Sequence, residues 1–257
     1  MMLVILSCDS PNVEYYPNGK ISKEYHLKEM KLDGIYKEFN LDGSIKLIHQ
    51  YAYGIKIDSS IFFENGSVQK IDYYKNNDTL FSVRFYPNLK KQEEGNFYKE
   101  NKIGKWSYYS DDGRLEKVFE YINLNRHQYT NQGWYFNKNG DTLFNKSNFY
   151  KLKVKKSVLN PKEQTLVSIS YNPLFKNAAC GVLISKEKLL KDNYSNFDER
   201  NVDTLYFVDD KLQFATEFKG KGHKNLGGCI LEVNKNPTPE DTYSERRVYI
   251  SIPFDVR

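Results

Sequence analysis

Apolar and polar residues alternate with a period of two along most of this chain. Between Lys105 and Tyr109, Trp106 and Tyr108 fall on one side and the residues between them fall on the other. Farther along, the stretch YKLKVKKS alternates lysine with leucine and valine. Successive side chains of a strand point to opposite faces, so this pattern predicts strands with one wet face. The 21 Tyr and 16 Phe, against 3 Met, also favour strands over helices, and the predicted fold class is all-β.

Turn signals recur at nearly constant spacing in the first half of the chain. An Asn-Gly or Asp-Gly pair follows an aromatic residue at five positions, namely Gly19, Gly43, Gly66, Gly113 and Gly140. In FYPNLKK, Leu89 stands where the same spacing places a glycine. Such pairs between apolar strands are the strongest short-range signal for a hairpin with a type I′ turn, whose two central residues both need positive φ. The pattern predicts β-hairpins about 23 residues apart over residues 9–148.

The predicted hairpins need one another. A single two-stranded hairpin is marginally stable in water and can bury its aromatic face only against the next one. We therefore expect an elongated antiparallel meander of stacked hairpins, in which terminal units act as caps and aromatic cross-strand pairs supply much of the cohesion.

A family resemblance rests on these repeated segments. GIYKEFNLDGSIK, GKWSYYSDDGRLEK and GWYFNKNGDTLF resemble the bacterial variant of MORN repeats, and the likeness covers roughly residues 13–143. The resemblance implies a β-hairpin array used for binding. Many bacterial sequences of this kind are described as the antitoxin partner of a toxin, which is one candidate role.

The second half of the chain, residues 149–257, follows a different pattern. About seven short alternating segments are separated by turn-rich stretches such as NKNPTPED, which predicts an antiparallel β-sandwich. It is similar to the immunoglobulin-like sandwiches of exported bacterial proteins. Cys180 and Cys229 lie in two of the predicted strands. They are either a disulfide pair or two buried thiols, and their spacing does not decide between the two.

The N-terminus suggests a cellular address. MMLVILSC is too short an apolar run to span a bilayer, and Ile5 to Cys8 resembles a bacterial lipobox, with Ser7 beside the bond that would be cleaved. The resemblance implies that Cys8 carries a lipid, and that the protein is anchored to a membrane of the cell envelope and faces an extracytoplasmic space. No Lys or Arg precedes the run, so the alternative is an apolar N-terminus with an unmodified cysteine.

Several kinds of chemistry find no support in the sequence. The net charge of +5 lies entirely after residue 143, where 19 Lys and Arg stand against 14 Asp and Glu, without the dense Arg clusters of a nucleic-acid groove. GxSxG, P-loop and HExxH motifs are absent, and the 4 His are scattered. We expect no nucleic-acid partner, no cofactor, no metal and no enzymatic activity.

The leading interpretation is a lipid-anchored binding or scaffold protein with a protein partner. Tyrosine gives a large contact area at little entropic cost, and the candidate binding residues are Trp106, Tyr108, Tyr109, Trp134 and Tyr135. The alternative is a carbohydrate or cell-wall binding module in which exposed rings stack on polysaccharide or hold a cation. The tryptophans must be exposed for that alternative, whereas the first interpretation buries them between hairpins.

The tripeptide Asp-Thr-Leu occurs three times and offers a candidate modification. It places Thr79, Thr142 and Thr204 in a sequence that resembles the O-glycosylation sequon of one group of bacteria. The same tripeptide is also a natural strand start, because Asp suits a turn and Thr suits a strand.

Overall fold

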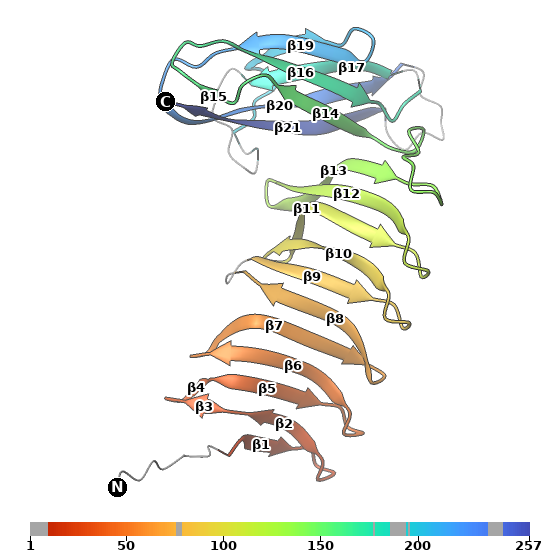
Figure 1. Cartoon of the computed structure of the whole chain (residues 1–257), viewed down its shortest axis with the longest axis vertical. Coiled ribbons are helices and arrows are strands. Elements are labelled where there is room, and N and C mark those ends of the chain that lie inside the picture. The colour runs from red at the N-terminus through yellow and green to blue at the C-terminus, as the bar shows by residue number, and fades with distance from the viewer. Residues whose placement is uncertain (1–9, 76–78, 177, 186–193, 195, 236–243) are drawn as a thin grey trace. The chain divides into compact units, whose positions relative to one another are not determined.

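The computed structural model describes residues 10–75, 79–176, 178–185, 194, 196–235 and 244–257. Every regular element within them is a β-strand, so the predicted all-β class is confirmed. Eleven strands form one long antiparallel sheet, in the order β1-β2-β5-β6-β7-β8-β9-β10-β11-β12-β13 (Figure 1). Apart from a two-stranded insertion between β2 and β5, each strand pairs with its neighbour in the sequence, which is the predicted meander.

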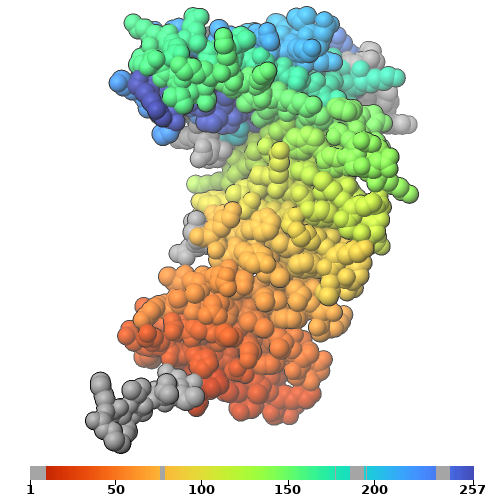
Figure 2. Space-filling view, in the orientation of Figure 1, coloured from red at the N-terminus to blue at the C-terminus, as the bar shows by residue number. Residues whose placement is uncertain are grey.

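The chain divides into two compact units, Met1–Leu115 and Glu116–Arg257. The first contains β1 (Asn12–Tyr15), β2 (Ile21–Tyr25), β3 (Leu27–Lys28), β4 (Lys31–Leu32), β5 (Gly34–Phe39), β6 (Ile45–Ala52), β7 (Ile55–Glu64), β8 (Ser67–Tyr74), β9 (Thr79–Phe85), β10 (Lys91–Tyr98) and β11 (Asn101–Tyr109). Its hairpins follow one another in chain order (Figure 2).

The glycine turns join strands as predicted, but most have a different geometry. Only Asn65 and Gly66 both have positive φ, of 52° and 76°, as a type I′ turn requires. At the first turn, Tyr16 N donates to Lys20 O and Gly19 N donates to Tyr16 O. This is a three-residue loop in which glycine alone takes the left-handed conformation next to a bulge. The same bonds form the turns around Gly43, Gly113 and Gly140, so the type I′ prediction is wrong there.

Leu89 occupies the left-handed position of the fourth turn, with φ of 63°. Its N–H donates to Tyr86 O, as the glycine N–H does in the other three-residue loops. The turn is therefore kept without glycine, and the hairpin interval of about 23 residues continues through it.

Side chains from one turn hold the next turn in the first unit. The Tyr16 hydroxyl donates to the carbonyl of Phe39 at 2.7 Å, and Tyr86 donates in the same way to Tyr109 at 2.8 Å. The Asn and Lys of each Tyr-Pro-Asn-x-Lys segment donate to two further carbonyls of the neighbouring turn. These bonds satisfy turn carbonyls that no strand pairing reaches.

The second unit contains a sandwich and the last hairpin. Its strands are β12 (Leu115–Leu124), which begins at the unit boundary, β13 (His127–Tyr135), β14 (Phe149–Val154), β15 (Val158–Leu159), β16 (Thr165–Asn172), β17 (Ala178–Ser185), β18 (Val202–Tyr206), β19 (Lys211–Thr216), β20 (Gly222–Asn234) and β21 (Glu245–Val256). One sheet has the order β14-β16-β19 and the other β15-β21-β20-β17-β18. The core lies between them, where Val167 and Ile169 meet Val182, Ile230 and Ile250.

The last hairpin packs on the outer face of the five-stranded sheet. Tyr129 packs with Cys229 and Tyr249 in a second apolar cluster. The Asn131 side chain donates to Tyr249 O at 2.9 Å and accepts from Tyr249 N at 2.7 Å, so it pairs with that residue as a strand backbone would. The division expected at residues 148/149 marks where the repeat stops, whereas the compact unit already begins at Glu116.

Candidate functional site

The sheet of the first unit has two chemically different faces. Residues directly opposite one another on paired strands share a face, so the strand register assigns each side chain. We call one the polar face; its members are Lys23, Tyr36, Glu38, Leu47, His49, Ser60, Phe62, Lys70, Asp72, Ser82, Arg84, Glu93, Gly95, Trp106 and Tyr108. We call the other the aliphatic face; its members are Glu24, Ile35, Lys37, Ile48, Ile57, Ile61, Ile71, Tyr73, Val83 and Glu94.

A row of buried polar side chains crosses the polar face. His49, Ser60, Asp72 and Ser82 are paired in succession on β6 to β9, and each is at most 5% exposed. His49 Nδ1 and the Tyr74 hydroxyl both hydrogen-bond to Ser60 Oγ, while Ser82 Oγ donates to Asp72 at 2.7 Å. Buried polar groups need such partners, because an unpaired one costs about 1–3 kcal/mol. The row is therefore held in one arrangement.

Burial also sets the charge state of this row. Desolvation lowers the pKa of His49 to about 4, and the nearby Lys56 ammonium acts in the same direction. Burial likewise raises the pKa of the Tyr74 hydroxyl and lowers that of Lys56. At neutral pH His49 is thus an uncharged ring, which suits its hydrogen bond with a serine hydroxyl better than a buried cation does.

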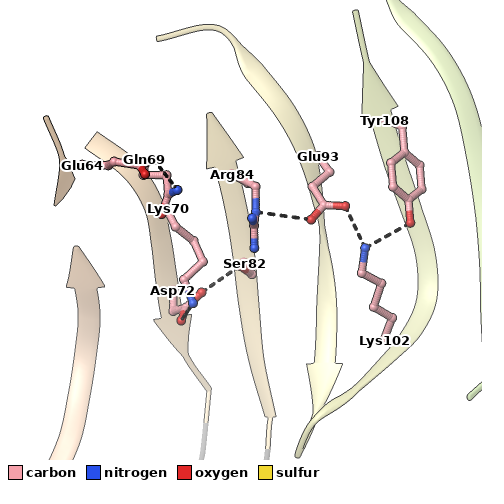
Figure 3. A network of polar contacts seen from close by, with 9 residues as sticks. All are labelled: Glu64, Gln69, Lys70, Asp72, Ser82, Arg84, Glu93, Lys102 and Tyr108. Atoms are coloured by element: carbon pink, nitrogen blue, oxygen red, sulfur yellow. Dashed lines mark hydrogen bonds and ion pairs between the residues drawn. The ribbon is translucent and has the colours of Figure 1, made fainter. Parts of the chain in front are cut away.

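Charged side chains form a second row beside the first (Figure 3). Arg84 and Lys102 both reach the carboxylate of Glu93, at 3.5 Å and 2.7 Å. Lys102 also donates to the Tyr108 hydroxyl at 3.1 Å. These residues come from β9, β10 and β11, so the network fixes charges across three strands. Arg84 remains 47% exposed at its side chain and is available to a binding partner.

Trp106 lies on the polar face but is covered. Its ring rests on Gly95, where an added Cβ would come within 2.4 Å of the ring. The Lys102 ammonium lies 3.9 Å from the ring centroid on the indole, and the indole N–H donates to Asn96 O at 2.9 Å. Only 1% of Trp106 is exposed, so its ring surface serves packing.

The other four predicted binding residues are not gathered into one site. Tyr108 belongs to the polar face, whereas the Tyr109 hydroxyl donates to Glu94, a residue of the aliphatic face, at 2.5 Å. In the second unit, Trp134 stacks on Phe149 with ring centroids 5.6 Å apart. Tyr135 meets the Phe119 ring edge-on at 5.6 Å.

Both cysteines of the sandwich are free thiols. Cys180 pairs with Glu232 on the neighbouring strand, while Cys229 pairs with Leu183. These positions are three residues out of register, so the two side chains point to opposite faces of the sheet. Cys180 packs against the sandwich core and Cys229 against the last hairpin. The disulfide alternative is therefore wrong, and burial raises the pKa of each thiol to about 12.

The remaining predicted residues are dispersed. Thr204 is exposed on the edge strand β18, and Thr79 and Thr142 are partly buried. Cys8 lies outside the described residues. Within the part of the chain that the structure describes, no three His, Cys, Asp or Glu side chains gather as metal ligands, and no helix is long and apolar enough to cross a membrane.

The largest described groove lies in the sandwich and has a volume of about 490 Å³. It opens between the edge strands β18 and β19 and is lined by apolar side chains such as Leu205 and Phe214, with Asp203 and Glu217 at its border.

Sequence reasoning missed the buried polar row. His49, Asp72 and Gly95 are 23 residues apart and occupy equivalent places in successive hairpins. Extending the turn interval to the strands between the turns was the signal that pointed to this row.

No known protein family matches the chain, and no curated protein or solved structure shows significant similarity to it. The function must therefore be argued from the chemistry of its surfaces.

Proposed function

We propose that this protein is a non-enzymatic scaffold that binds a protein partner through the polar face of its hairpin sheet. A lipid on Cys8 holds it at a membrane of the bacterial cell envelope, facing the extracytoplasmic side. The anchor rests on the lipobox-like sequence before Cys8, and the MORN-like pattern of the repeats agrees with a binding role.

One observation carries the proposal, namely that the polar face is already ordered. Arg84, Glu93 and Lys102 hold one another, and Lys70 and Ser82 hold Asp72. Binding costs about 0.5–1.5 kcal/mol for each long side chain that must be immobilised. A surface whose charged groups are fixed in advance avoids much of this cost and gives a partner a defined pattern of charges and hydroxyls.

The carbohydrate alternative has less support. A sugar-binding platform needs exposed rings, but Trp106 is covered by Gly95 and Lys102, and Trp134 stacks on Phe149. The antitoxin role implied by the repeat resemblance fits poorly with a lipid-anchored protein, because an antitoxin acts in the cytoplasm.

The test is capture of partners from an envelope extract by the full chain carrying Cys8→Ser. Arg84→Glu reverses the most exposed charge of the network, and Lys153→Glu makes the same change on an exposed strand of the sandwich. We expect saturable capture of a protein by the parent chain and by Lys153→Glu, and at least a tenfold loss with Arg84→Glu. Circular dichroism checks that both variants fold.

A glycan-binding screen runs beside the capture experiment. Equal capture by Arg84→Glu and the parent chain contradicts a role for the polar face. Saturable binding to polysaccharide without capture of a protein favours the carbohydrate alternative.

A further inference from the structure

An unbroken aliphatic row runs across the face opposite the polar face. Ile48, Ile61, Ile71 and Val83 lie directly opposite one another on β6, β7, β8 and β9. Val83 is 6% exposed and the three isoleucines are half-buried. The first unit is a single sheet, so lateral neighbours alone cover this row, and solvent still reaches its outer side.

More apolar surface borders the row. Ile35, Ile57 and Tyr73 belong to the same face, and each is between 39% and 49% exposed. Scattered exposed apolar residues are ordinary, whereas a contiguous patch of several hundred Å² marks an interaction surface in most soluble proteins. The pairing of the row makes this patch contiguous over four strands.

Charges of opposite sign stand at the two ends of the row. Lys37 is paired with Ile48 at one end, and Glu94 is paired with Val83 at the other. Each already has an in-chain partner, since Lys37 contacts Glu24 and Glu94 contacts Lys91, both at 2.8 Å. The sequence across six strands is thus one cation, four aliphatic residues and one anion.

We propose that this face binds a second copy of the chain, with the two sheets packed face to face. A two-fold axis parallel to the strands reverses the strand order of the partner. It sets Ile61 of one copy against Ile71 of the other, Ile48 against Val83, and Lys37 against Glu94. A two-fold axis perpendicular to the strands sets Lys37 against Lys37, so the charges select the first arrangement.

The size of the patch fits a reversible dimer. Strands lie about 4.8 Å apart, so the distance from β5 to β10 is about 24 Å, and three same-face positions on a strand extend about 14–20 Å. The footprint is roughly 400 Å² per copy, which corresponds to total buried accessible surface on the order of 1,000 Å². That lies at the lower end for specific interfaces and predicts micromolar association. The polar face stays free, so this inference stands apart from the proposed function.

The first experiment measures mass by sedimentation of the full chain carrying Cys8→Ser, from about 1 to about 100 μM, the range in which such an interface associates. We expect a monomer–dimer equilibrium that Ile71→Lys weakens at least tenfold. Leu166→Lys puts the same change on an exposed strand position of the sandwich and leaves the equilibrium unchanged. A parent chain that stays monomeric throughout, or an Ile71→Lys variant that dimerises as well as the parent, overturns the proposal.

A second experiment tests the orientation and does not depend on a buried substitution. Lys37→Glu places two anions together at each end of the dimer, and Glu94→Lys places two cations together. We expect each variant alone to dimerise at least tenfold more weakly, while their equimolar mixture regains parental association because every facing pair is again opposite in charge. A mixture no stronger than its components refutes this arrangement.

Discussion

The contact between Gly95 and Trp106 gives the sharpest test of how the hairpin sheet is packed. Gly95 has an ordinary negative φ, because it is not among the left-handed residues, so alanine fits its backbone. The Cβ of Gly95→Ala would nevertheless lie 2.4 Å from the ring of Trp106. That is about 1 Å inside ordinary carbon contact, and the atom it meets belongs to a rigid ring that is 1% exposed.

The magnitude follows from three contributions. Overpacking of this kind costs about 1–3 kcal/mol. Displacing the ring also strains the hydrogen bond from the Trp106 indole to Asn96 O, which is worth about 1 kcal/mol. Alanine in place of a strand glycine returns about 0.5–1 kcal/mol by restricting the unfolded chain. We expect Gly95→Ala to lower the free energy of unfolding of the first unit by about 2 kcal/mol.

Urea unfolding followed by tryptophan fluorescence measures this change. A Trp134→Phe background leaves Trp106 as the single reporter. Gly181→Ala is the matched control, because its Cβ would lie at an ordinary 3.5 Å from Leu205 O, and it should be neutral within about 0.5 kcal/mol. Combining Gly95→Ala with Trp106→Leu should cost less than the sum of the two changes, since the smaller side chain removes the clash. An unchanged midpoint, or full additivity, refutes the packing.

Three further predictions follow from the same structure. Because the folded-state pKa of His49 is lowered to about 4 from an ordinary 6.5, its contribution to stability is complete above about pH 6.5 and falls towards pH 4 by at most roughly 3 kcal/mol; urea titrations should show a flatter profile for His49→Gln. Tyr86→Phe should cost about 1 kcal/mol by releasing the Tyr109 carbonyl, whereas Tyr206→Phe, at an exposed ring, should change nothing in thermal melts. Thiol titration of the Cys8→Ser chain without reductant should find Cys229 unreactive when folded, and two reactive thiols in denaturant.

The hairpin array could be predicted from the sequence because its signals are local. A turn needs a residue that tolerates positive φ at one position, and the chain supplies glycine there in every turn but one. Leu89 shows the limit of that signal, since the turn keeps its backbone bonds with a leucine in the left-handed position. The loop type was less predictable, because Asn-Gly serves both the two-residue turn at Gly66 and the three-residue loop at Gly19.

The cysteine pair and the tryptophans could not be placed from local pattern. Whether Cys180 reaches Cys229 depends on the register between β17 and β20, which sets them three positions apart on opposite faces. Burial of Trp106 depends on a glycine eleven residues away in the neighbouring strand. Both outcomes are fixed by pairing between strands, and neither is contained in a single strand.

The same register explains why the two faces of the sheet were not separated by alternation alone. Equivalent positions one repeat apart, such as Ile48 and Ile71, or Ile71 and Glu94, are 23 residues apart. Twenty-three is odd, so an alternating pattern carried from one repeat into the next changes face, and each bulge shifts it again. Face identity is instead passed from strand to strand by direct pairing. This is why the charged ends of the aliphatic row, at Lys37 and Glu94, come into line only when every register between β5 and β10 is known.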